Sequence, residues 1–137
     1  MFFNRFRGII TIYCYTFKQS NNKSRRNIKK KEGEKNMEEM LDALQAASNV
    51  TKLIMENDRV RVFDAWFKPG VQAAMHTHPD HVLYVLNGGK LQLTPSKGET
   101  QEVDLKAGQA IWMDATAHTA ENLGKTDVHL LVVELKD

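Results

Sequence analysis

Regularly spaced turn signals are the feature that most constrains how this chain of 137 residues can fold. After Asn49, short runs rich in Val, Ile, Leu and aromatic residues alternate with these signals. Such punctuation is typical of an antiparallel β-sandwich or β-barrel. The turn signals are Asn57-Asp58, Pro69-Gly70, Pro79-Asp80, Asn87-Gly88-Gly89, residues 95–98, Ala107-Gly108 and Leu123-Gly124.

Nine strands are predicted between these turns, a number that suits a jelly-roll barrel. Residues 37–47 have apolar positions three and four residues apart and acids near their start, which predicts a short amphipathic helix. The predicted fold is therefore all-β, an antiparallel jelly-roll barrel with a short N-terminal helix. The predicted strands span residues 50–55, 59–68, 72–78, 81–86, 90–94, 101–105, 109–113, 118–122 and 127–135.

The first 36 residues differ from the rest of the chain in charge and pattern. They hold ten of the nineteen Lys and Arg residues and two acids, a net charge of +8, whereas residues 37–137 carry −6. They show neither a helical nor an alternating period, so we expect a disordered basic segment at 1–36 and a single barrel domain at 37–137. The acidic domain has no basic stripe, which argues against nucleic acid as its partner.

Three interpretations of residues 1–36 stay open. Arg5 and Arg7 precede an apolar run, as in a secretory signal, but no small-residue cleavage site follows. A basic tail that binds nucleic acid or anionic lipid is the second interpretation. We favour a third, in which the segment is translated upstream sequence of an A/T-rich bacterial genome, because it is rich in Phe, Ile, Tyr, Asn and Lys. The true start would then be Met37.

Several classes of protein are disfavoured by what residues 37–137 lack. The single cysteine is Cys14, so this part has no disulfide, thiolate ligand or cysteine nucleophile. No run of about 18 or more apolar residues predicts a membrane span, and we expect a cytoplasmic protein. Gly88-Gly89 is predicted to be a hairpin turn rather than part of a phosphate-binding loop, which argues against nucleotide-dependent chemistry.

All five histidines lie beyond residue 75, and three of them fall within six residues. His76 and His78 are two apart in a predicted strand, so their imidazoles leave the same face about 6.6 Å apart. They can close on one ion at bonds of about 2.0 Å, which predicts a metal site. His81 follows the Pro79-Asp80 turn and can project over the same interior, whereas His129 is predicted to be a surface or packed residue.

The first part of this histidine cluster resembles a motif of the cupin family, and the resemblance as a whole covers residues 50–135. The motif is Gly, five residues, His, one residue, His, three or four residues, Glu, six residues and Gly. In this chain Gly70, His76, His78 and Gly88 fit it, with His81 in the place of the glutamate after a turn of two residues.

A second stretch resembles the other cupin motif, which is Gly, five residues, Pro, one residue, Gly, two residues, His, three residues and Asn. Here it runs from Gly108 through His118 to Asn122. Asp114 and Thr116 replace the usual Pro and Gly, and one residue is missing before His118. The two motifs together are a more specific signal than either one.

This resemblance implies that His76, His78 and His118 are metal ligands and that His81 is a candidate for a fourth. The ion would be divalent, one of Fe, Ni, Zn, Cu or Mn, and an all-imidazole site suits Fe, Ni, Cu or Zn better than an oxygen-loving ion such as Mg²⁺. If His81 is not a ligand, it is a partner of one or a general base.

Met113 and Asn122 are candidates for lining a pocket beside this site. A dioxygenase that acts on a small enol, diketone or thiol resembles what all-histidine cupins do, so the resemblance implies this chemistry on a small-molecule substrate, and we favour it. A metal-dependent isomerase or lyase is an alternative and needs a proton acceptor, for which His81, Asp114 and Tyr84 are candidates.

A different class of function also stays open, a small-molecule-binding sensor without turnover. The strand predicted at residues 50–55 could pair with a neighbouring copy, so a homodimer is expected.

Overall fold

One short helix and nine strands make up residues 40–137, the part of the chain that the computed structural model describes. The three interpretations of residues 1–36 lie outside this described part. The elements are α2 (Ala43–Ala46), β1 (Thr51–Glu56), β2 (Val60–Phe67), β3 (Gln72–His78), β4 (His81–Asn87), β5 (Gly89–Pro95), β6 (Gln101–Leu105), β7 (Ala110–Met113), β8 (Thr116–Asn122) and β9 (Val128–Leu135).

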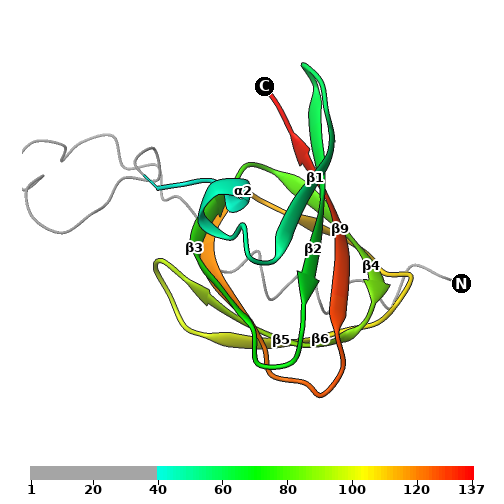
Figure 1. Ribbon diagram of the computed structural model, residues 1–137. Coiled ribbons are helices and arrows are strands. Elements are labelled where there is room, and N and C mark those ends of the chain that lie inside the picture. Colours follow the sequence, from blue (N-terminus) through cyan, green and yellow to red (C-terminus); the bar gives the residue numbers. More distant parts are fainter. Residues whose placement is uncertain (1–39) are drawn as a thin grey trace, which may run out of the picture. The chain divides into compact units, whose positions relative to one another are not determined.

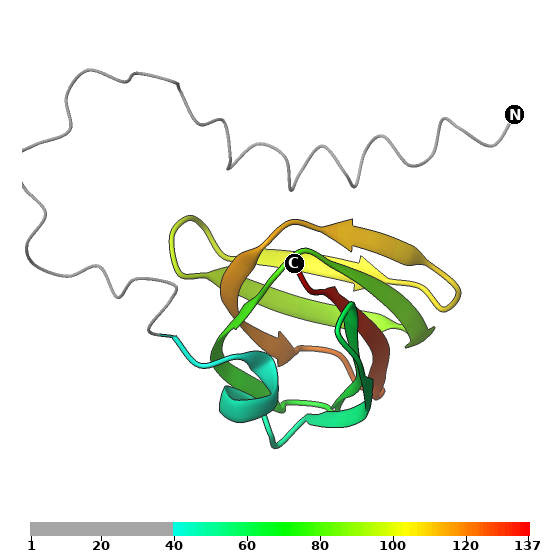
Figure 2. The same cartoon turned by 90° about the horizontal axis from the view of Figure 1, so that it is seen from above.

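The strands form two antiparallel sheets that curve around a common interior (Figures 1 and 2). One sheet has the strand order β1-β2-β9-β4-β7 and the other the order β3-β8-β5-β6. Because β3 and β4 lie in different sheets, as do β4 and β5, the chain crosses repeatedly between the two layers. This is the predicted jelly-roll barrel, and each strand begins and ends within two residues of its predicted bounds.

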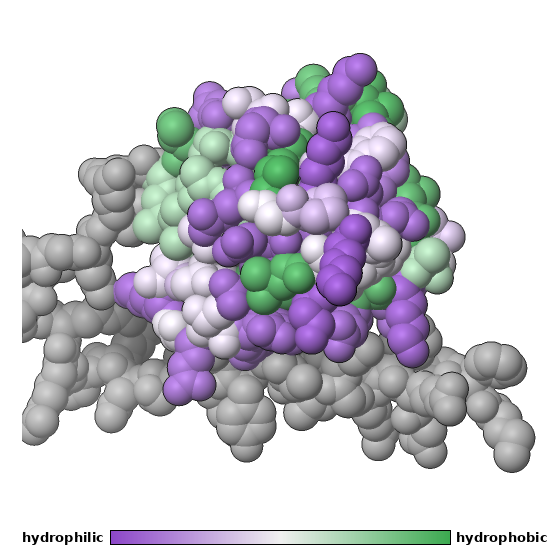
Figure 3. Space-filling view, turned by 60° about the horizontal axis from the view of Figure 1, so that its bottom comes forward, coloured by the Kyte–Doolittle hydropathy of each residue, from purple (hydrophilic) through white to green (hydrophobic). Residues whose placement is uncertain are grey.

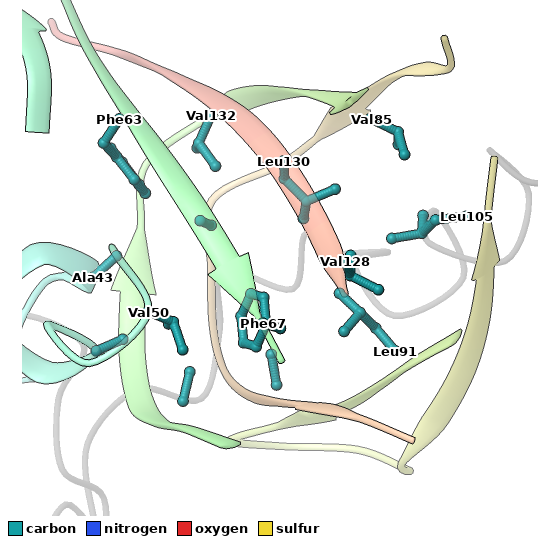
Figure 4. Close-up of a cluster of buried hydrophobic side chains, with 14 residues drawn as sticks. Ala43, Val50, Phe63, Phe67, Val85, Leu91, Leu105, Val128, Leu130 and Val132 are labelled. Atoms are coloured by element: carbon teal, nitrogen blue, oxygen red, sulfur yellow. The ribbon is translucent and has the colours of Figure 1, made fainter. Parts of the chain in front are cut away.

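Alternate side chains of both sheets fill the barrel with an apolar core (Figure 4). In β9 the inward positions are Val128, Leu130 and Val132, all buried, with less buried residues between them. Phe63 of β2 is the largest apolar side chain that is fully buried. The remaining buried apolar residues of the cluster are Ala43, Ala47, Val50, Ala65, Phe67, Ala73, Val85, Leu91, Leu105 and Ala120.

The predicted helix over residues 37–47 is wrong at its start, as far as the described residues show. Thr77 of β3 donates its backbone N–H to the carbonyl of Leu41 at 3.0 Å, and Asp42 forms a parallel bridge with Thr77. Backbone pairing with β3 therefore keeps this segment extended, against its helical period. The helix begins only at Ala43, where the Asp42 carboxylate caps it by accepting the Gln45 N–H at 3.0 Å.

The prediction of a hairpin turn at Gly88-Gly89 is also wrong. Gly88 lies between β4 and β5, where the chain passes from one sheet to the other. A Cβ atom on Gly88 would overlap the carbonyl oxygen of Leu105. Glycine is therefore required here by the close approach of two backbone segments and not by hairpin geometry.

The outer face of the five-stranded sheet exposes large side chains, including Trp66, Tyr84 and Trp112. The face drawn in Figure 3 is mostly polar, with apolar residues in separate small patches. No helix in the described part of the chain has the length and apolar character that a membrane crossing requires. The expected homodimer stays a prediction.

Candidate metal centre

Four of the five histidines gather at one end of the barrel interior, where both sheets contribute strands. β3 carries His76 and His78, and its pairing with β8 places His118 directly opposite His76. His81 begins β4 in the other sheet. All four side chains are buried. The structure therefore brings together the four histidines that the sequence predicted to be close.

Two short turns join the sheets beside this histidine cluster. The first, Pro79-Asp80, connects β3 to β4, and the second, residues 114–115, connects β7 to β8. The Ala115 N–H donates to the Asp80 carboxylate at 2.7 Å, and the Leu135 N–H donates to the Asp80 carbonyl at 2.9 Å. These two turns are the places where the chain departs from the spacings of the two cupin motifs. They contact each other and stabilise one end of the barrel.

His76, His78 and His118 form a compact group that could hold a metal ion. Their ring centroids lie 4.7 Å apart for His76 and His78, 4.8 Å for His76 and His118, and 5.2 Å for His78 and His118. One ring nitrogen from each lies within 4.8 Å of the others. Bonds of about 2.0–2.1 Å in tetrahedral geometry place ligand nitrogens about 3.4 Å apart, so the rings would have to close further around a bound ion.

Hydrogen bonds at Nδ1 orient two of the histidine rings. Nδ1 of His76 lies 2.6 Å from the Ala74 carbonyl, and Nδ1 of His81 lies 2.7 Å from the Pro79 carbonyl. A carbonyl oxygen only accepts, so each Nδ1 is the donor and each Nε2 keeps its lone pair. In both residues the nitrogen available to an ion is therefore Nε2.

The Nε2 atom of His81 is buried and is the one such side-chain atom of residues 40–137 without a hydrogen-bond partner. Buried polar atoms are rarely left in this state, so an unpaired lone pair here fits a site that receives an ion or ligand. The ring lies 4.5 Å from that of His78, yet His81 does not belong to the group of three close nitrogens. The donor set present is three converging imidazoles with a fourth beside them.

A buried carboxylate that the sequence analysis missed contacts the histidine cluster. Glu134 of β9, only 1% exposed, places Oε1 2.6 Å from Nδ1 of His78. Its Oε2 accepts from Nε and Nη2 of Arg61 at 2.8 and 2.5 Å, and Nη1 of Arg61 lies 3.1 Å from Asp42. The sequence did hold a signal, because Glu134 continues the inward phase of β9 and Arg61 lies two residues before the inward Phe63.

Burial keeps the imidazoles of the histidine cluster uncharged. It lowers the pKa of His76 and His81 below 6.5, although the carbonyl partners at Nδ1 act in the opposite direction. For His78, burial and the neighbouring histidines lower the pKa to about 2. The same two causes hold the pKa of His118 well below its ordinary value. All four therefore offer lone pairs rather than charge near neutral pH.

The other predicted site residues divide into one that is near the cluster and several that are not. Met113 is buried and pairs with His81 across β7 and β4, so both side chains face the interior. Asn122 lies four residues from His118, about 13 Å along β8. Its amide donates to the carbonyls of Phe67 and Thr126 and accepts the Gly124 N–H, so it holds a loop and does not join the cluster.

Of the proposed proton acceptors, two lie away from the histidine cluster. Tyr84 is three residues from His81 on β4 and so faces outward, and it is exposed. Asp114 is exposed and accepts the indole N–H of Trp112 at 2.9 Å. His129 is packed, as predicted: it stacks on Trp66 and lies 2.8 Å from Asp64.

Comparison with known protein families shows that residues 65–134 match the family described as "Cupin domain". This match spans about half of the chain and includes all four histidines of the cluster and Glu134. No match is found among the curated protein sequences.

Solved structures agree with this fold. A cupin domain from Bordetella pertussis Tohama I is 24% identical with a TM-score of 0.60, and the alignment covers 64% of this chain and 93% of that one. A cupin family protein from Methanocaldococcus jannaschii is 18% identical with a TM-score of 0.52, covering 64% and 79%. A Cupin 2 conserved barrel domain protein from Salinispora arenicola is 17% identical with a TM-score of 0.51, covering 67% and 79%. These likenesses show the fold alone.

The lowered histidine pKa values predict that the metal-free protein loses stability in acid. Unfolding returns each imidazole to a pKa near 6.5, so below this pH the unfolded chain binds more protons than the folded one. The free energy of unfolding therefore falls as the pH falls below about 6.5, by up to about 1.4 kcal/mol per pH unit for each histidine. Urea unfolding in the presence of a chelator, repeated between about pH 7.5 and 5, measures this slope.

One carboxyl group acts in the opposite direction. Burial raises the pKa of Glu134, against the effect of Arg61, so this group favours folding as the pH falls. It opposes four imidazoles, and the net slope keeps the sign set by the histidines. A free energy of unfolding that stays constant from about pH 7 to 5 would contradict the neutral, buried state of the cluster.

Proposed function

The chain belongs to the cupin family, and from this premise we propose that it holds a divalent metal ion in its histidine cluster and binds a small molecule there. The convergence of one nitrogen each from His76, His78 and His118, within 4.8 Å of one another, is the observation that carries the proposal. His81 is the candidate for a fourth ligand, because its buried Nε2 has no other partner among the described residues.

The donor set decides which ions fit. Neutral imidazole nitrogens suit Fe(II), Ni(II), Cu(II) and Zn(II), and Mn(II) less well. No carboxylate replaces an imidazole in the group of three nitrogens, and His81 stands where cupins commonly have Glu. We therefore expect a nitrogen-preferring ion, with open positions left for an oxygen-donor ligand.

Dioxygenase-type chemistry on a small molecule is the activity that we favour. A bound Fe(II) ion would supply Lewis acidity and redox chemistry toward dioxygen. The chain would orient His76 through the Ala74 carbonyl and His78 through Glu134. The barrel interior would limit the access of water, since all four histidines are buried.

An isomerase or lyase is the second candidate, and one observation favours it specifically. Its proton acceptor has to lie beside the metal, and His81 is the one of the three candidates that does so. Nδ1 of His81 is engaged with the Pro79 carbonyl, which leaves the Nε2 lone pair to accept a proton. His81 would then act as the general base and not as a ligand.

A sensor without turnover is the third candidate and differs from both enzymes in its behaviour. Oxygen uptake by the Fe(II)-loaded full chain separates the dioxygenase from the other two. Tight binding of a small molecule without any turnover would favour the sensor.

Removing a ligand should remove the metal. We expect the full chain, purified without added metal, to contain about one equivalent of a transition metal by elemental analysis. His76→Ala and His118→Ala should retain less than about a tenth of it, because each loses one of three converging donors.

The control for these variants is His129→Ala, which removes a histidine that lies outside the cluster and should leave the metal content unchanged. Circular dichroism checks that the variants keep their strands. Equal metal content in wild type, His76→Ala and His118→Ala would contradict the proposed site.

Restoring the acid at position 81 should change the preferred metal. His81→Glu adds a carboxylate where Nε2 of His81 now has no partner, and oxygen donors favour Mn(II) relative to an all-nitrogen set. Competition of Mn(II) against Zn(II) should shift toward Mn(II) by about tenfold or more. The same Mn(II) to Zn(II) ratio for both proteins would mean that residue 81 does not contact the ion.

A further inference from the structure

We propose that Glu134 is a positioning residue that orients His78 for metal binding. This inference rests on the proposed function. It concerns a residue outside both histidine motifs, on the last strand of the barrel.

The two oxygens of the Glu134 carboxylate have separate partners. Both guanidinium contacts, from Nε and Nη2 of Arg61, go to Oε2. Oε1 is left to Nδ1 of His78, 2.6 Å away. With Arg61 favouring the carboxylate form, Nδ1 is the donor and the lone pair of His78 lies on Nε2. A carboxylate that accepts from one ring nitrogen while the other faces an ion is a recurrent arrangement in metal sites.

Strand pairing explains why Glu134 reaches His78. In the five-stranded sheet, Arg61 and His81 are the cross-strand neighbours of Glu134 on its two sides. Side chains at paired positions face the same way, so all three point into the barrel. His78 comes from the opposite sheet. The hydrogen bond between Glu134 and His78 thus spans the interior and joins the two sheets at the histidine cluster.

A purely structural ion pair between Glu134 and Arg61 would not need the hydrogen bond to His78. Arg61 already lies between two carboxyl groups, those of Glu134 and Asp42, and contacts Oε2 of Glu134 alone. His76 and His81 are oriented by backbone carbonyls, whereas His78 is oriented by a charged group.

Glu134→Gln in the full chain tests this role. The substitution replaces one of the two acceptor oxygens by an NH2 group that only donates, so the side chain can no longer accept from Arg61 on one atom and from His78 on the other. We expect the Zn(II) dissociation constant, measured by competition with a chromophoric chelator, to rise about 10–100-fold. The visible absorption of the Co(II)-loaded protein should also change, because the His78 ring loses its fixed orientation.

The matched control is Asp64→Asn, the same change in a carboxylate that lies 2.8 Å from the His129 ring, away from the histidine cluster. It should leave both the Zn(II) affinity and the Co(II) spectrum unchanged. A structural role would lower the melting temperature of metal-free Glu134→Gln but leave its Zn(II) affinity and Co(II) spectrum as in wild type, and that result would overturn the inference. Absence of metal binding in the wild type would instead overturn the proposed function.

A measurement on the wild-type protein covers the case in which Glu134→Gln does not fold. Nitrogen-15 chemical shifts of the imidazole rings identify which nitrogen of His78 carries the proton. We expect a protonated Nδ1 and an unprotonated Nε2 in the metal-free protein, with the Nε2 resonance moving when Zn(II) is added. A proton on Nε2, with Nδ1 accepting from a protonated Glu134, would overturn the inference.

Discussion

The pairing register between β3 and β8 is the constraint on which the histidine cluster depends. It places His118 opposite His76, although 42 residues separate them in the chain. A slip of one residue would turn the histidines of one strand to the outer face of the barrel. The contact between Asp80 and Ala115 joins the turns at the ends of these strands and opposes such a slip. Both departures from the cupin motif spacings shorten a turn, residues 79–80 in one case and 114–115 in the other. Because these two turns contact each other, the four histidines still come together.

The interior combines an apolar core with a polar end, and the two parts have different purposes. Core residues such as Phe63 and Val132 stabilise the barrel by removing apolar surface from water. Four buried histidines and a buried glutamate add little to stability, and well-packed apolar residues of similar size would often stabilise a core more. Their presence at one end of the barrel is expected of a site that gives up stability for binding.

Much of this structure could be predicted from local patterns. Alternation and turn residues predicted all nine strands, and the spacing of His76 and His78 predicted that they share a face. The helix start could not be predicted this way, because a backbone bond from Thr77 to Leu41 overrides the local helical period. The pairing of Arg61 with Glu134 joins residues 73 positions apart. Neither residue was identified from the sequence; strand phase alone would have placed each on an inward face, and only the sheet order brings them together.

X-ray absorption at the zinc edge of the Zn(II)-loaded full chain tests most directly whether the histidine cluster is a metal site. A histidine-ligated ion has nitrogen neighbours at about 2.0–2.1 Å and the outer-shell scattering of imidazole rings. We predict three or four imidazoles around the ion in the wild type and a loss of imidazole scattering in His118→Ala. A shell of oxygen atoms without imidazole scattering, or the same spectrum for both proteins, would contradict a metal ion bound by this cluster.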